Sequence, residues 1–176
     1  MADAALNNTV EDTRLKYHED LEKVSDIIET TCEEKDAIGF RFTCKPATEY
    51  DVLPQKYKST ADGYNPSKEE LDALPSDKRK KYATARGLSM FTSPERAHAK
   101  AKSLSKNIEK KAGREEAERF ELEHPYIAKF VISASSGGET EPNKEGHFNF
   151  FPYEDVEVLN LIDDTFEYIE IHYHED

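Results

Sequence analysis

A short stretch, residues 86–97, places hydroxyl groups where a ligand-binding turn would need them. It resembles a short apolar strand followed by a turn, with Ser89 inside the strand and Ser93 just before a helix. Ser93 can cap that helix, Pro94 suits its first position, and Glu95 suits the positive end of the helix dipole. The sequence therefore predicts a well-defined strand-to-helix junction, a kind of site that often holds ligands.

Two other residues could carry chemistry from neighbouring strands. Residues 39–44 alternate aromatic and polar side chains, so Arg41 is expected to point away from Phe40 and Phe42 and to be exposed. His147 begins a later strand, where it could orient a ribose or act as an acid or base near neutral pH. Structural roles stay open for both, because an arginine can cover a sheet edge with its stem and a strand histidine often only donates hydrogen bonds.

The order of these features resembles the ADP-ribosyltransferase superfamily. An early strand with an arginine, the Gly-Leu-Ser-Met-Phe-Thr-Ser-Pro-Glu-Arg-Ala junction and a late cluster at residues 146–152 follow one another over roughly residues 38–171. The resemblance implies that Arg41 holds the phosphates or ribose of NAD and that Ser89 and Ser93 shape the nicotinamide pocket. It also implies a carboxylate that stabilises the positive charge developing at the sugar.

That carboxylate is missing from its expected place. Many members of the family have Glu-x-Glu where residues 147–149 here are His-Phe-Asn, and a neutral side chain cannot supply the charge alone. Glu154, Glu167 and Glu170 are the candidate replacements. We take Glu170 as the catalytic acid, with His147 as its catalytic partner, because Glu170 lies on an expected late strand. If no carboxylate reaches the cleft, the domain binds a nucleotide without transferring it.

The charge of the chain is unevenly distributed. The net charge is −13: residues 1–36 carry 4 basic and 11 acidic residues, residues 67–112 carry 12 and 6, and residues 139–176 carry 1 and 12. Acidic ends repel DNA and anionic lipid, so direct nucleic-acid binding and membrane binding are not expected. The alternative function is an acidic, non-enzymatic interaction protein that engages a basic partner and imitates nucleic acid.

Several other classes of site lack a pattern in this sequence. Cys32 and Cys44 are the only cysteines, and neither belongs to a CxxC motif, so we expect reduced thiols. His172 and His174 share one strand face without a specified third ligand, so no metal site is expected. No apolar run approaches the ~20 residues of a membrane span, and no secretory signal begins the chain. The expected location is cytoplasmic.

The expected fold is a single α+β domain over residues 1–176, with an N-terminal helical segment at 1–36 and a core at 37–176. Apolar residues at positions 17, 21, 24 and 28 predict an amphipathic first helix. The sheet is expected to be mixed or mostly antiparallel, with about five or six strands and two to three further helices. We expect Arg41, Ser89 and His147 to converge in one cleft.

Some segments are predicted with definite bounds. We expect a long loop at 46–66, a helix from Pro94 to Gly113, a mobile loop at 135–146, and strands at 147–151, 156–162 and 166–172.

Overall fold

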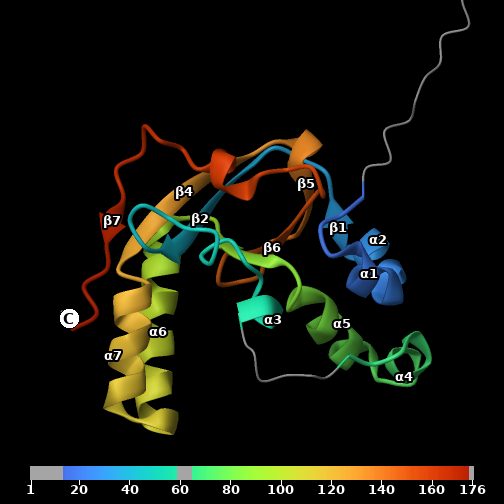
Figure 1. Cartoon of the computed structure of the whole chain (residues 1–176), viewed down its shortest axis with the longest axis horizontal. Helices are drawn as coiled ribbons and strands as arrows, with labels where there is room; N and C mark the ends of the chain where they lie inside the picture. The colour runs from blue at the N-terminus through green and yellow to red at the C-terminus, as the bar shows by residue number, and fades with distance from the viewer. Residues whose placement is uncertain (1–13, 59–64, 175–176) are drawn as a thin grey trace, which may run out of the picture.

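The structure is a computed structural model that describes residues 14–58 and 65–174. Its architecture is α+β: one antiparallel sheet carries helices on one side and irregular segments on the other (Figure 1). The predicted fold class is therefore confirmed. The sheet has seven strands, more than expected, because a glycine-rich segment and two very short outer strands also join it.

The sheet has the order β1-β5-β6-β3-β2-β4-β7, and every neighbouring pair is antiparallel. β2 lies near its centre and pairs with β4 from Ala37 opposite Ile132 to Thr43 opposite Tyr126. The two outermost strands have two residues each. The strands are β1 (Cys32–Glu33), β2 (Ala37–Thr43), β3 (Leu88–Phe91), β4 (Tyr126–Ile132), β5 (Gly137–Thr140), β6 (His147–Pro152) and β7 (Ile169–Glu170).

The helices begin and end where the local sequence provides caps. Ser93 accepts a hydrogen bond from the backbone N–H of Arg96 at the start of α6, and Gly113 ends that helix with a positive φ of 96°. Ser67 and Glu70 form a capping box on α4. The helices are α1 (His18–Leu21), α2 (Ser25–Thr31), α3 (Gln55–Lys58), α4 (Lys68–Asp72), α5 (Ser76–Thr84), α6 (Pro94–Ala112) and α7 (Arg114–Glu123), with 3-10 turns η1 (Glu22–Val24), η2 (Ala134–Ser136) and η3 (Val158–Leu161).

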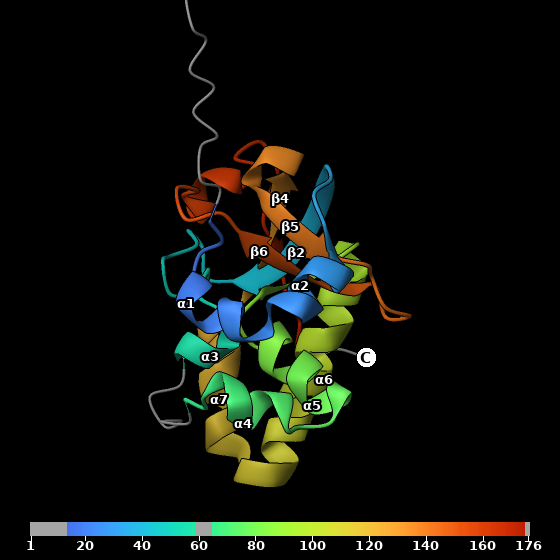
Figure 2. The ribbon, with the colours of Figure 1, turned by 90° about the vertical axis from the view of Figure 1, so that its right-hand side faces the viewer.

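One face of the sheet, here called the helix face, carries the side chains of Phe40, Phe42, Phe91 and Phe151. It is covered by two separate groups of helices, which Figure 1 shows at opposite ends of the sheet and Figure 2 shows one in front of the other. The α6–α7 hairpin packs on Phe40 and Phe91 through small residues such as Ala97. Helices α1, α2, α4 and α5 pack around Phe151. The helix face therefore has two apolar clusters rather than one continuous core.

The opposite face, here called the loop face, carries Arg41, Leu88, Met90 and Phe150. Residues Leu88, Met90 and Phe150 are at most 1% exposed, and irregular chain covers them. Val52 from the segment after β2 and Val158 from η3 belong to the same cluster. The largest apolar cluster of the described residues thus lies under loops and a 3-10 turn.

Several of the predicted segments are wrong. The expected loop at 46–66 contains α3, the expected strand at 166–172 is only the two residues of β7, and five helices rather than two to three follow the N-terminal segment in the described residues.

The expected mobile loop at 135–146 contains β5, because Gly137 brings the backbone against Phe151, where a Cβ atom would lie 2.1 Å from the Phe151 carbonyl oxygen. The expected strand at 156–162 is the η3 turn, because this segment crosses over the loop face instead of pairing along it. Only Ile162 forms a bridge, to Phe130.

The predicted first helix is broken in the described residues. Tyr17 has a left-handed φ of 66°, and α1, η1 and α2 follow as three short pieces. Their apolar residues nevertheless face the sheet as the periodicity indicated, with Leu21, Val24 and Ile28 buried. None of the described helices is long and apolar enough to cross a membrane.

Candidate functional site

Arg41 lies at the centre of the sheet and is 7% exposed, so the expectation of an exposed arginine is wrong. The alternation in β2 did not reveal that both faces of this strand are covered. The guanidinium donates to three backbone carbonyls: to Asp51 at 2.8 Å, to Ser89 at 2.6 Å and to Leu53 at 3.4 Å. Burial lowers the pKa of Arg41 to about 10, although the Asp51 carboxylate opposes this shift. Arg41 therefore ties β3 and the segment after β2 together.

Ser89 and His147 lie on the helix face, away from the Arg41 side chain. β3 pairs with β6 so that Ser89 faces Asn149 and Phe91 faces His147. Leu88 and Met90 alternate with Ser89 and Phe91 and belong to the loop-face cluster. The three residues that we expected in one cleft are therefore divided between the two faces of the sheet.

The other two expected site residues, Ser93 and His147, take part in helix capping and in side-chain packing. Ser93 caps α6, as the sequence predicted. The His147 ring lies 5.3 Å from the Phe91 ring, and burial together with the nearby Lys100 ammonium lowers the pKa of His147. A neutral imidazole at physiological pH can accept as well as donate a hydrogen bond.

The three candidate acids are exposed and lie apart from His147. Glu170 lies on β7 opposite Tyr126, and three strands separate β7 from β6. Glu154 follows the end of β6 opposite to His147, and Glu167 lies in the segment before β7. The described structure thus does not place any of these carboxylates beside Ser89 or His147.

Sequence reasoning missed a buried acid, Glu139 on β5. It is 3% exposed, lies opposite Phe150 on the loop face, and its Oε2 atom has no hydrogen-bond partner among the described residues. Burial raises its pKa. The preceding Gly137-Gly138 pair indicated a loop, so the sequence provided no signal for this burial.

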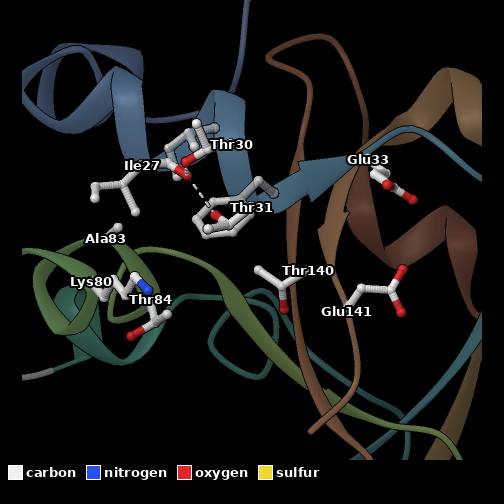
Figure 3. A pocket seen from close by; sticks show the side chains of 11 residues that line it. Ile27, Thr30, Thr31, Glu33, Lys80, Ala83, Thr84, Thr140 and Glu141 are labelled. Carbon is white, nitrogen blue, oxygen red and sulfur yellow. Dashed lines mark hydrogen bonds between the residues drawn. The ribbon is translucent and has the colours of Figure 1, made fainter. Parts of the chain in front are cut away.

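A groove of about 430 Å³ lies between α2, α5 and the β5 end of the helix face, and Figure 3 shows its side chains. We call it the threonine groove, because four of its lining residues are threonines. In the figure, Lys80 and Thr84 lie on the α5 wall, across the groove from Thr140, and the carboxylates of Glu33 and Glu141 point away from α5. The lining residues are Ile27, Ile28, Thr30, Thr31, Glu33, Lys80, Ala83, Thr84, Thr140, Glu141 and Phe151.

A second groove, of about 390 Å³, lies between α7 and the C-terminal segment. We call it the acidic groove. Two of the large apolar side chains that the described surface exposes lie in or beside it: Leu122 is 80% exposed and Ile169 is 39% exposed. The lining residues are Glu118, Glu121, Leu122, Pro125, Glu170, Ile171 and Tyr173.

Apart from the two grooves, a group of titratable side chains surrounds Lys58. Its ammonium lies 4.7 Å from the centre of the Tyr50 ring and forms no ion pair with a described residue. Burial, followed by the Arg41 charge, lowers the pKa of Lys58 to about 8. The nearby Cys44 thiol donates to the Glu123 carbonyl at 3.2 Å, and burial raises its pKa, so this thiol is not activated.

Within residues 14–58 and 65–174, no three His, Cys, Asp or Glu side chains are grouped so that they could hold a metal ion. His174 instead contacts Glu121 and Arg114.

Comparison of the chain with protein-family models, with curated proteins and with solved structures finds no match. Function must therefore be inferred from the chemistry of these sites.

Proposed function

We propose that this chain is an acidic, non-enzymatic interaction protein that binds a basic segment of a partner protein in the acidic groove. The observation that carries the proposal is the combination, in one groove, of an exposed leucine with carboxylates on both walls. Leu122 is 80% exposed, and Glu118 and Glu170 line the groove from α7 and β7. An exposed apolar side chain inside a charged rim is typical of a protein-binding surface.

The charges of the groove favour a cationic partner. Glu170 forms no ion pair with a described residue. Glu118 already pairs with Arg114, and Glu121 accepts hydrogen bonds from Ser105, Arg114 and His174. A lysine or arginine of the partner would therefore meet Glu170 at the rim, and an apolar side chain beside it would cover Leu122. The chain's net charge of −13 would speed such an encounter at low salt.

A synthetic peptide that repeats Lys-Lys-Leu provides the test. We expect saturable amide shifts around α7 and β7 in NMR titrations, with an affinity that falls as salt is added. Glu170→Lys and Leu122→Ser should each weaken binding about fivefold, close to 1 kcal/mol. Glu154→Lys is the matched control, because it makes the same charge change at an exposed site away from the groove. An equal loss of affinity in Glu154→Lys would show that only the net charge matters. It would contradict a defined binding site.

Binding of NAD is a second candidate, because Ser89, Asn149 and His147 do share the helix face. The Asn149 backbone N–H donates to Thr140, so this polar row reaches the threonine groove. A rise in unfolding temperature with NAD would support it, because a ligand of the folded state stabilises that state. An ADP-ribosyltransferase activity would also require hydrolysis of NAD or transfer of its ADP-ribose. No thermal shift with NAD would leave only the interaction protein.

A further inference from the structure

The threonine groove has the size and floor of a small-molecule site. Its volume of about 430 Å³ falls inside the ~300–1,000 Å³ that such sites have. Ile27, Ile28, Ala83 and Phe151 provide an apolar floor. A ligand with one apolar face would therefore remove this floor from water.

Three threonine hydroxyls of the groove donate their protons to their own helices. Thr30 donates to the Asp26 carbonyl at 2.7 Å, Thr31 to the Ile27 carbonyl at 2.6 Å, and Thr84 to the Lys81 carbonyl at 3.2 Å. Each hydroxyl has a single proton, so these oxygens can only accept hydrogen bonds from a ligand. The ligand must bring O–H or N–H donors to this part of the groove.

The electrostatics of the groove disfavour an anion. Thr31 ends α2 and Thr84 ends α5, so two helix C-termini, which carry partial negative charge, face the groove. A phosphate would meet these C-termini with Lys80 as the only cation among the lining residues. The carboxylates of Glu33 and Glu141 point away from α5, since Glu33 pairs with the loop-face residue Glu139.

A cation is also disfavoured, because the Lys80 ammonium lines the groove and the neighbouring carboxylates already have a partner. Lys35 lies 2.6 Å from a Glu141 oxygen and 3.9 Å from a Glu33 oxygen. The groove therefore keeps the threonine oxygens and the helix C-termini as acceptors and Lys80 as a donor.

We infer that the threonine groove binds a neutral polyhydroxylated ligand, either a saccharide or the sugar of a nucleoside. The ligand hydroxyls would donate to the Thr31 and Thr84 hydroxyl oxygens, while the Lys80 ammonium would donate to a ligand oxygen. The C–H face of the sugar ring would lie on the apolar floor around Phe151. This site is distinct from the acidic groove, which lies on the α7 side of the molecule.

Methyl-NMR titrations with maltotriose, adenosine and AMP at millimolar concentrations test the inference. We expect saturable shifts of the Thr31, Thr84 and Thr140 methyl groups with maltotriose or with adenosine, and the probe that produces them identifies the source of the sugar. AMP should bind about tenfold more weakly than adenosine, because its phosphate meets the helix C-termini. Shifts with AMP alone, or none with any of the three probes, would overturn the inference.

Two lysines of α5 allow a matched comparison. Lys80→Ala should weaken binding of the sugar about tenfold, since one charge-assisted hydrogen bond is lost. Lys81→Ala removes an equal charge from the next residue, which does not line the groove, and should leave the affinity unchanged. Unfolding curves of both variants check that they fold alike. Equal affinities of the two variants would contradict the assigned role of Lys80.

Discussion

The loop face buries two ionisable side chains, Arg41 and Glu139, in opposite ways. Three backbone carbonyls accept from the Arg41 guanidinium, whereas the Glu139 Oε2 atom has no partner among the described residues. Both side chains are less than 10% exposed. A buried charge with matched hydrogen bonds fixes the chain around it, and one without them destabilises the fold. Burial alone therefore does not identify a catalytic group in this molecule.

Removal of Arg41 should have the largest effect. Arg41→Ala leaves the carbonyls of Asp51, Leu53 and Ser89 without their donor, so we expect a loss of about 3 kcal/mol or more in the free energy of unfolding. Urea unfolding measures it. Arg119→Ala is the control, because this arginine is exposed and pairs only with Glu116 among the described residues.

Arg41→Lys provides a second measurement in case Arg41→Ala does not fold. It keeps the charge but cannot reach three carbonyls, so its stability should fall between wild type and Arg41→Ala. A loss below about 1 kcal/mol in both variants would mean that the segment after β2 does not depend on Arg41.

Replacement of Glu139 should instead increase the free energy of unfolding. Glu139→Gln removes a charge that the fold disfavours, and we expect a gain of about 1 kcal/mol at pH 7. The folded-state pKa is raised above the ordinary 4.5, so the stability contribution of the protonated acid is complete below pH 4.5 and is lost as the pH rises through the folded-state pKa.

The stability gain of Glu139→Gln over wild type should therefore shrink as the pH is lowered toward 4.5. Thermal unfolding of wild type and variant across this range measures it, with the exposed Glu154→Gln as control. A variant less stable than wild type at pH 7 would show that the Glu139 carboxylate has a partner in the folded state.

Replacement of Asp163, which pairs with Lys129 of β4, should have a smaller effect on stability. Hydrogen bonds from Lys129 and Thr165 lower its pKa from 3.8 to about 2, and Lys129 Nζ lies 2.9 Å from the carboxylate. The stabilisation is present above pH 3.8 and is lost as the pH falls through about 2. Asp163→Asn should therefore be less stable than wild type at neutral pH, and the difference should shrink as the pH falls through about 2. A constant difference down to that pH would contradict the ion pair.

The smallest effect concerns reactivity rather than stability. At pH 8 about half of the Lys58 amines should be neutral, against under about 1% for an ordinary lysine. NMR titration of ¹³C-dimethylated protein should show one lysine with a midpoint near 8, absent from Lys58→Arg. A spectrum in which every lysine titrates near 10 would exclude the effect of burial and of the Arg41 charge on this amine.

The sequence predicted the features that depend on local chemistry. Ser93, Pro94 and Gly113 bound α6 as expected, because caps and positive φ angles are properties of the residues themselves. The capping box of Ser67 and Glu70 is a local feature of the same kind.

Features that depend on tertiary packing were not predicted. Alternation in β2 indicated one buried face, but the segment with Val52 covers the other face as well, and this burial of Arg41 has no local signal. Gly137 and Gly138 indicated a loop, although the missing side chain at Gly137 is what lets β5 approach Phe151. Glu170 lies on a late strand as expected, but strand order places that strand at the far edge of the sheet.

The shortness of the two outermost strands has a consequence for self-association. A long, flat edge strand offers a row of free N–H and C=O groups on which another chain can add a strand. β1 and β7 offer only two residues each, and β7 carries Glu170. β7 pairs with β4 only at Tyr126 and Ile127, and Ile162 forms a further bridge to Phe130, so the outer side of β4 is covered in short pieces. We expect copies of the folded chain to resist stacking through their sheets.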